Sequence, residues 1–322
     1  MDKTCFVLSR NWTNKTKNSM MQKPTVSVCM ITYGHEKYIR EAIEGVLMQE
    51  CNFEVELILA NDCSPDKTDE VIQDILKNHP KAFWIKYVKH DKNIGMMPNF
   101  LFALNHCKGE FIALCEGDDY WIDTLKLQKQ VSFLESNEEF VIHSGKAHIL
   151  QENKITQIIG DPLLKSSYKI DDFYTKNNLV TCTVLFRNDT IKSAYFEKIL
   201  FGDWMLYVIL LHKNKASNAY VADALYSVYR IHEGGVMQNL SNKIDSCIAH
   251  FKQIFKIRQL LRPSYTSLDI QQINSYCLNI SKYYLDNKSY WKGIYMLTSH
   301  FSLVKTKLPV TKYLKMVKTL LN

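Results

Sequence analysis

Apolar and polar residues alternate in two rhythms along the first third of the chain. Residues 26–32 are mostly apolar, which predicts a buried strand. The next apolar residues recur at the spacing of one helix face, at Ile39, Ile43, Val46 and Leu47. The alternation continues with expected strands at 55–60, 83–88 and 111–115 and expected helices at 66–77 and 98–105. Elements in this order build βαβ units, so we predict an α/β fold with a Rossmann-like, mostly parallel sheet flanked by helices.

The pattern changes after Asp119. A helix is expected at 123–135 and another at 204–211, with strands at 140–150, 180–187 and 220–230. Beyond Ser241 the pattern is almost entirely helical, with helices expected at 244–261, 268–285, 290–300 and 310–321. We therefore expect a flexible lead over residues 1–23, an α/β domain over 24–240 and a helical C-terminal subdomain over 241–322.

Composition narrows the class of protein. The 322 residues are 46% hydrophobic and 23% charged, which is typical of a globular protein. The nine cysteines are scattered and never spaced as Cys-x-x-Cys, so a disulfide framework is disfavoured and a reducing compartment fits better. The longest apolar run, Trp204–Leu211, is far shorter than the roughly 20 residues of a membrane-spanning helix. The first residues lack the apolar core of a signal peptide, so we expect a cytoplasmic protein.

Charge is unevenly distributed. Residues 1–23 carry a net charge of +4 and the segment after Asp286 carries +7, which leaves the body mildly acidic. Nucleic-acid binding requires a basic body with interleaved aromatic residues, so we expect no nucleic-acid partner. The basic C-terminal helices suit peripheral contact with the anionic inner face of a membrane, and a solvated lysine-rich face is the alternative.

Polar residues gather where the predicted strands end. Thr32 ends the first strand, Asp62 follows the second, and residues 116–119 (Glu-Gly-Asp-Asp) follow the fourth. Ligands of open α/β sheets bind outside the carboxyl ends of the strands, so these groups should converge on one edge. Oxygen ligands of this kind suit Mg²⁺ or Mn²⁺ beside nucleotide phosphates. A solvated acidic turn is an equally good interpretation of the four residues by themselves.

Missing motifs exclude several enzyme classes. No Gly-x-Gly-x-x-Gly follows the first strand, which disfavours a dinucleotide site, and no P-loop sequence is present. No Gly-x-Ser-x-Gly elbow is present, which argues against an α/β-hydrolase. A nucleotidyltransferase is disfavoured because Tyr33-Gly34-His35-Glu36 stands where a basic, glycine-rich loop is expected.

Several segments in this order resemble the family 2 glycosyltransferases, which are inverting, nucleotide-sugar-dependent enzymes with the GT-A fold. They are 26–33 (VSVCMITY), 60–68 (ANDCSPDKT), 93–95 (NIG), 116–121 (EGDDYW), 201–204 (FGDW) and 229–232 (YRIH). The resemblance covers about residues 24–236 and does not extend to the helical tail.

The resemblance implies roles for residues on the donor side. The nucleotide pocket would be lined by Thr32, Tyr33 and Asp62, with Asp62 accepting a hydrogen bond from the base. Asn93 and Gly95 would lie in the loop that closes over this pocket. Asp118 and Asp119 match the acidic motif and would hold Mn²⁺ or Mg²⁺ and the ribose or diphosphate. Arg230 and His232 match a later motif and would lie near the diphosphate or the metal. The other nine histidines show no spacing typical of a metal site.

On the acceptor side the resemblance implies that Asp203 is the base that activates the acceptor, with Trp204 binding substrate beside it. An inverting transfer needs a carboxylate to remove the acceptor's proton and a cation to stabilise the leaving diphosphate. Without the family, a helix N-cap is the better interpretation of Asp203. The expected function is metal-dependent transfer from a nucleotide sugar, first of all a UDP-sugar, to a glycan or lipid-linked acceptor in surface polysaccharide synthesis. The alternative is a nucleotide-sugar-binding scaffold without turnover.

Overall fold

The computed structural model describes residues 25–160, 165–213, 218–235, 238, 240, 243–261, 263–289, 291–293 and 295–296. The expected lead over 1–23 and the expected helix at 310–321 lie outside these residues, as does most of the helix expected at 290–300. The chain divides into two compact units. The first contains the described residues up to Tyr168, Leu179–Ala194 and Lys213–His232. The second contains Lys169–Asn178, Tyr195–His212 and the described residues from Glu233 onward.

The first unit contains a ten-stranded sheet, and the predicted α/β class is confirmed. Its strands are β1 (Val26–Thr32), β2 (Val55–Asn61), β3 (Ile85–Lys89), β4 (Phe111–Leu114), β5 (Tyr120–Trp121), β6 (Phe140–Gln151), β7 (Lys154–Ile159), β8 (Ser167–Tyr168), β9 (Leu185–Arg187) and β10 (Asn218–Ile231). Its helices are α1 (Ile39–Leu47), α2 (Thr68–Asn78), α3 (Met96–His106) and α4 (Lys126–Ser136). The 3₁₀ turns among the described residues are η1 (Ala82–Trp84), η3 (Ile170–Phe173), η4 (Thr181–Thr183) and η5 (Ser193–Phe196).

Four neighbouring strands form the parallel part of the sheet. The order is β3-β2-β1-β4-β9-β6-β10-β5, and β3, β2, β1 and β4 are parallel neighbours. β9 is antiparallel to both β4 and β6, and these two reversals make β6 run in the same direction as β4. Since β10 is parallel to β6, its carboxyl end lies at the same edge of the sheet as those of β1, β2 and β4.

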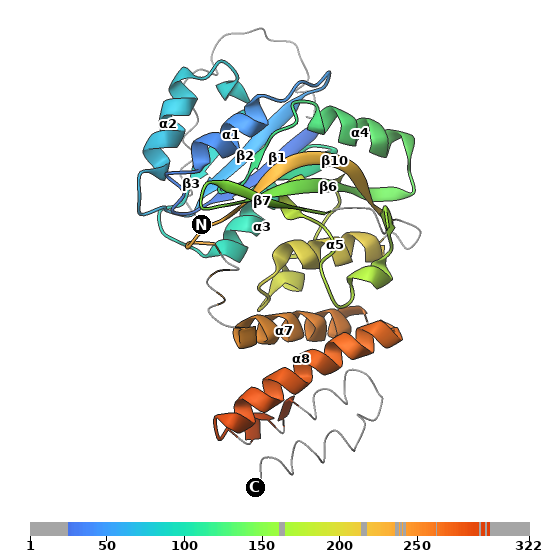
Figure 1. The fold of residues 1–322 in the computed structure, drawn as a ribbon. Coiled ribbons are helices and arrows are strands. Elements are labelled where there is room, and N and C mark those ends of the chain that lie inside the picture. Colours follow the sequence, from blue (N-terminus) through green and yellow to red (C-terminus); the bar gives the residue numbers. More distant parts are fainter. Residues whose placement is uncertain are drawn as a thin grey trace. The chain divides into compact units, whose positions relative to one another are not determined.

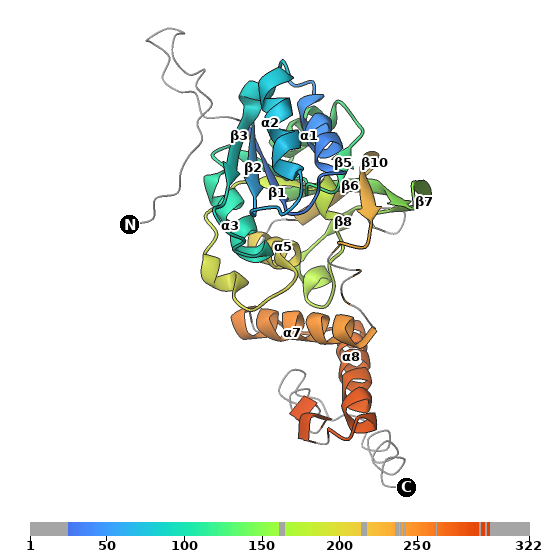
Figure 2. The ribbon, with the colours of Figure 1, turned by 90° about the vertical axis from the view of Figure 1, so that its left-hand side faces the viewer.

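Helices cover both faces of the parallel part. Alternate residues of β1 and β2 point to opposite faces, and Val28 and Leu57 belong to the main apolar core together with residues of α1, α2 and α4. The helix α3 packs against β1 and β2 through residues outside that core, such as Ala103 and Leu104. Figures 1 and 2 show α1 and α2 together and α3 apart from them. This layering leaves the carboxyl edge for loops.

Two predicted strands were wrong in part. Residues 83–84 of the strand expected at 83–88 belong to the turn η1, so β3 begins only at Ile85. Residues 180–187 were expected to be extended throughout, but Thr181–Thr183 form the turn η4 and only Leu185–Arg187 pair as β9. The Thr183 hydroxyl explains the turn, because its Oγ1 donates to the Val180 carbonyl at 2.7 Å and accepts from the Gly145 N–H at 3.1 Å. Local bonds of this kind compete with the sheet ladder.

The second unit is helical in its described part. Its helices are α5 (Gly202–Lys213), α7 (Lys243–Leu261) and α8 (Ser267–Asp286). The last residue of α5, Lys213, is counted with the first unit. The helix α8 begins with a capping box in which Thr266 and Asp269 bond each other's backbone N–H groups. Asp269 also accepts a buried hydrogen bond from Thr175 at 2.8 Å, which joins α8 to the segment 169–178. Among the described helices, none combines the length and apolarity that crossing a bilayer requires.

A fully buried lysine lies at the start of α4. The Lys126 Nζ donates to Gln130 Oε1 at 2.7 Å and lies 4.0 Å from the centre of the Trp121 ring. Gln130 in turn donates to the Thr183 carbonyl at 2.8 Å. Burial lowers the pKa of Lys126 to about 7, because the charged form loses its hydration. The lysine therefore links α4 to the segment that follows the acidic turn.

Replacing Lys126 with Met should remove a pH dependence of stability. The folded protein binds this proton only below about pH 7, whereas the unfolded chain binds it up to about pH 10.5, so between these values the unfolded state holds more protons. The wild-type free energy of unfolding should rise by about 2 kcal/mol between about pH 7 and about pH 9, relative to that of Lys126→Met. Urea titrations at both pH values measure it. The exposed Lys129→Met variant is the control, and an equal pH dependence in all three proteins would contradict the assignment.

Candidate functional site

The carboxyl edge of the sheet in the first unit collects polar residues from four strands. Thr32 ends β1, Asp62 follows β2, the acidic turn 116–119 follows β4, and His232 follows β10. Two backbone hydrogen bonds hold these ends together: the Asp62 N–H donates to the Thr32 carbonyl and the Gly117 N–H donates to the Ile31 carbonyl, both at 3.0 Å. The predicted convergence of strand ends is therefore present.

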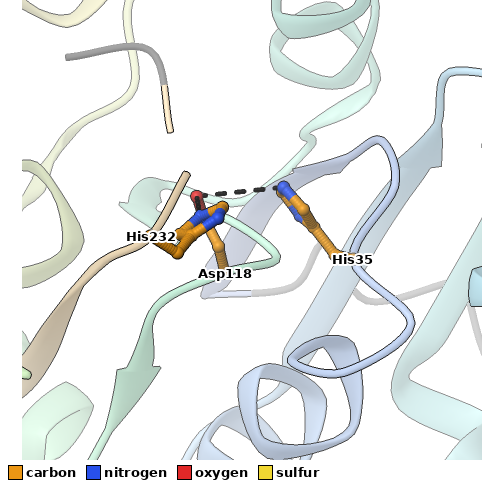
Figure 3. Close-up of side chains that lie close together, drawn as sticks. All are labelled: His35, Asp118 and His232. Atoms are coloured by element: carbon orange, nitrogen blue, oxygen red, sulfur yellow. Dashed lines mark hydrogen bonds and ion pairs between the residues drawn. The ribbon is translucent and has the colours of Figure 1, made fainter. Parts of the chain in front are cut away.

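Asp118 lies between two histidines. Its Oδ2 is 3.0 Å from Nε2 of His232 and 3.8 Å from Nε2 of His35 (Figure 3). Histidine, cysteine, aspartate and glutamate are the side chains that commonly bind metals. Among the described residues, the one group of three or more of them whose ligand atoms all lie within 4.8 Å of one another is His35, Asp118 and His232. His35 comes from the loop after β1, so three separate chain segments supply the cluster. Two imidazoles and one carboxylate are a donor set that divalent transition metals accept.

The protonation states of this cluster suit a cation. Burial lowers the pKa of His35, and the nearby negative charge of Asp118 does not fully offset that effect. Burial alone raises the pKa of Asp118, but the hydrogen bond from His232 and the charges of both histidines outweigh it, so the pKa lies below its usual value. A neutral imidazole and an ionised carboxylate are the forms that bind metals.

Gly117 is required by the close approach of this turn to β1. A Cβ atom at position 117 would lie 2.8 Å from Cβ and Oγ1 of Thr32 and 3.0 Å from Nδ1 of His35. These distances are shorter than ordinary contacts, so only glycine fits without displacing its neighbours. The hydroxyl of Thr32 lies 3.2 Å from Nδ1 of His35 and thereby fixes the orientation of the ring.

Asp119 has a different environment from Asp118. Its carboxylate is 2% exposed, and its Oδ1 accepts the backbone N–H of Arg230 at 2.8 Å. Burial and then the charge of Asp118 raise the pKa of Asp119 well above its usual value. Asp119 does not belong to the three-residue cluster, which instead contains His35. We therefore replace Asp119 by His35 in the proposed metal ligand set.

Arg230 is bonded to the acidic turn through its side chain. Its Nη1 donates to the Asp118 carbonyl at 2.9 Å, its Nη2 forms an ion pair with Glu41, and its side chain is 8% exposed. The guanidinium also lies over the rings of Tyr38 and Tyr120, at 4.6 and 5.1 Å from their centres. These contacts give Arg230 a role in positioning the turn, and its place near the diphosphate stays a prediction.

A second group of residues lies at the ends of β2 and β3. The two carboxylate oxygens of Asp62 accept the backbone N–H groups of Ile94 and Gly95 at 2.7 and 2.9 Å. Gly95 has a φ of 94°, a conformation that favours glycine, and its N–H also meets Oδ1 of Asn93 at 3.0 Å. Asp62 therefore orders the 93–95 loop, which places three of the predicted nucleotide residues together. Tyr33, 48% exposed, is free of the core and open to a ligand.

The remaining predicted residues belong to the second unit. Asp203 lies in the first turn of α5, and its Oδ2 accepts a hydrogen bond from Nδ2 of Asn177 at 2.9 Å. Trp204 is 1% exposed, and its indole N–H donates to the Phe173 carbonyl at 2.7 Å. Because this ring is packed inside its own unit, we leave Trp204 out of the proposed substrate-binding residues.

His35 was not among the predicted site residues. The spacing of the histidines along the chain shows no metal motif, yet His35 lies three residues beyond the end of β1. Its position at a strand end was the available signal, since residues there share an edge with Asp118. The ligand set depends on tertiary proximity and not on sequence spacing.

The chain has an α/β fold with two histidines and a carboxylate clustered at the carboxyl edge of its sheet. The chain belongs to glycosyl transferase family 2, whose family model matches residues 27–195. An uncharacterised protein of Mycobacterium tuberculosis is 32% identical over 212 residues, which are 66% of this chain. The chain spans 60% of the length of that relative. The Escherichia coli enzyme WfaP, a UDP-Glc:α-D-GlcNAc-diphosphoundecaprenol β-1,3-glucosyltransferase, is 28% identical over 66% of this chain and 80% of its own length.

Solved structures show the same fold. Staphylococcus aureus TarS in complex with UDP-GlcNAc aligns with a TM-score of 0.52 and 17% identity, over 88% of this chain and 74% of that one. The mannosyltransferase PcManGT of Pyrobaculum calidifontis, in complex with GDP-Man and Mn²⁺, aligns with a TM-score of 0.53 and 14% identity, over 93% and 81%. The expected GT-A fold is confirmed.

Arg230→Lys should destabilise the protein although it keeps the charge. A lysine cannot bond the Asp118 carbonyl and Glu41 together, so a buried carbonyl loses a charged donor. We expect a loss of about 1.5–3 kcal/mol in the free energy of unfolding, measured by urea titration. Glu41→Gln removes only an exposed ion-pair partner and should cost less than about 1 kcal/mol. Equal losses in both variants would show that Arg230 does not order the turn.

Proposed function

We propose that this protein is a metal-dependent inverting glycosyltransferase that transfers a sugar from a nucleotide sugar to a glycan or lipid-linked acceptor. The observation that carries the proposal is the cluster of His35, Asp118 and His232 at the carboxyl edge of the sheet. Family membership supports the reaction class. A UDP-sugar is the first expected donor, because WfaP is named for UDP-Glc and TarS was solved with UDP-GlcNAc. The name of WfaP likewise supports a diphosphate-linked lipid acceptor and a role in surface glycan synthesis.

On the donor side, the nucleotide would bind at the ends of β1 and β2. Thr32, Tyr33 and Asp62 would line this pocket together with the loop that contains Asn93 and Gly95. Two backbone N–H groups already bond the carboxylate of Asp62, and each of its oxygens keeps a second lone pair that can accept from a base. The exposed ring of Tyr33 supplies an apolar face for the base or the ribose.

The donor set favours Mn²⁺ over Mg²⁺. Mg²⁺ prefers oxygen ligands in an octahedral shell, whereas two of the three groups here are imidazoles, which suit transition metals. The residues that would hold the ion are His35, Asp118 and His232. A bound cation supplies Lewis-acid stabilisation of the charge that grows on the leaving diphosphate. Arg230 and Asp119 keep Asp118 in place for this task.

On the acceptor side we assign the general base to Asp203. A hydrogen bond from Asn177 orients the carboxylate, and a carboxylate is a group that can take up the acceptor's hydroxyl proton. As the hydroxyl oxygen attacks the anomeric carbon, the proton moves to Asp203 and the bond to the diphosphate breaks. Attack from the face opposite the leaving group inverts the configuration.

Removing a proposed ligand should weaken metal binding without unfolding the protein. His35→Ala and Asp118→Asn should each weaken Mn²⁺ binding at least about tenfold, since each removes one ligand of a three-residue set. Binding is measured by the loss of the free Mn²⁺ signal in electron paramagnetic resonance. Asp119→Asn is the matched control, because its amide oxygen can still accept the Arg230 N–H and position 119 lies outside the three-residue cluster. If Asp119→Asn weakens binding and His35→Ala does not, the ligand set is Asp118 and Asp119, as the sequence analysis expected.

Asp203→Asn should stop transfer while donor binding remains. Loss of a general base lowers the rate by about 10²–10⁴-fold. A panel of nucleotide sugars with Mn²⁺, followed by the release of nucleoside diphosphate, identifies the donor and measures the rate. Donor affinity is measured separately by calorimetry. Unchanged turnover in Asp203→Asn would remove the base assignment, and absence of turnover with every donor would favour a binding protein.

A further inference from the structure

The second unit contains a groove between α7, α8 and the residues near 197. Its volume is about 720 Å³, which is in the range of small-molecule sites. One face of α7 lines it with residues three, four and seven positions apart: Ile248, Phe251, Lys252, Phe255, Lys256 and Gln259. Figure 1 shows α7 and α8 as successive helices, and these two helices contact each other within this unit.

The groove is strongly basic. Lys198, Lys252, Lys256 and Lys292 line it, and Glu197 is its one acidic residue. Within the described part of the chain, none of these four lysines forms an ion pair with a carboxylate. Four like charges around one hollow repel each other, and an anionic ligand relieves that repulsion. The lysines come from three segments of the chain, so the charge is gathered by the fold.

The same groove has an apolar wall. Phe251 and Ile280 are buried at its base, with 5% and 0% exposure, while Phe255, Tyr284 and Met296 are partly exposed along it. A bare phosphate would leave this wall in contact with water. A ligand that carries both an anionic head and a hydrocarbon chain fits the two halves of the lining.

Charge argues against residues 297–322 of this chain as the occupant of the groove. Residues 297–322 of this chain contain five lysines and no acidic residue. Placing them in the groove would add positive charge to a positive lining. A flat membrane surface fits less well than a single molecule, because the lysines and the apolar wall face a hollow.

We infer that this groove binds one molecule of a lipid phosphate, with the phosphate at the lysines and the hydrocarbon chain along Phe255, Tyr284 and Met296. The inference concerns the second unit alone and does not depend on the catalytic proposal. It adds a lipid site to a chain whose described helices cannot cross a bilayer.

Calorimetry with decyl phosphate on the full chain tests the inference, with inorganic phosphate and decanol as half-ligands. Decyl phosphate should bind saturably at one site and much more tightly than either half-ligand. The double variant Lys252→Gln/Lys256→Gln should weaken binding about thirtyfold, because each lysine near a lipid phosphate contributes about fivefold. The control Lys282→Gln/Lys288→Gln removes two lysines that do not line the groove and should bind as the wild type does.

Other outcomes would overturn the inference. Equal binding of inorganic phosphate would show a simple anion site, and equal loss in both double variants would show a general charge effect. Sedimentation of the protein with phosphatidylglycerol vesicles, without binding of decyl phosphate, would show a membrane surface instead. Absence of any binding would refute the lipid site. Far-ultraviolet circular dichroism and urea unfolding like those of the wild type show that the Lys252→Gln/Lys256→Gln variant is folded. Neither measurement depends on turnover, so failure of the catalytic proposal leaves these binding results unaffected.

Discussion

The buried carboxylate of Asp119 is the constraint on which the site depends. A carboxylate that is 2% exposed is costly unless it is hydrogen-bonded, and the backbone N–H of Arg230 provides a bond across 111 residues of sequence. That bond ties the turn after β4 to the end of β10. The guanidinium of the same arginine holds the Asp118 carbonyl, so both strand ends are fixed relative to each other. Asp118 and His232 can therefore meet at 3.0 Å.

Burial also sets the chemistry of the cluster. It lowers the pKa of His35 and so favours the neutral ring, while the bond from His232 keeps Asp118 ionised. Gly117 allows the turn to approach β1 closely enough for His35 to join. Beneath the turn, Lys126 packs on Trp121 and adds a buried polar network to the same region. The three residues of the cluster lie in turns and loops, and these buried contacts hold those segments in place.

The two units differ in the kind of ligand that they suit. The first presents carboxylate, imidazole and backbone groups at a sheet edge, and the second presents lysines above an apolar wall. Residues 24–286, between the two basic ends of the chain, carry a small negative net charge, and Lys198, Lys252 and Lys256 belong to this part. Two of them lie four residues apart on α7, and the fold brings Lys198 to the same groove. The net charge of the sequence does not reveal this clustering. Local charge density and overall charge are therefore separate guides to partners.

Most of the parallel sheet could be predicted because its strands are continuous apolar runs bounded by polar turns, and the order of the acidic motifs identified the family. The family resemblance also assigned Asp62 and the 93–95 loop to one pocket, and the two are hydrogen-bonded. The prediction missed that η4 interrupts the strand expected at 180–187, because a threonine side chain competes locally with the ladder. It missed His35 because a ligand set is a matter of distances in space. Sequence by itself determined the four parallel strands β1 to β4, the helices between them and which strand ends carry acids, since these follow from local pattern. Only the tertiary structure decided that His35 rather than Asp119 accompanies Asp118, because burial and the bond to Arg230 separate two adjacent carboxylates into different environments.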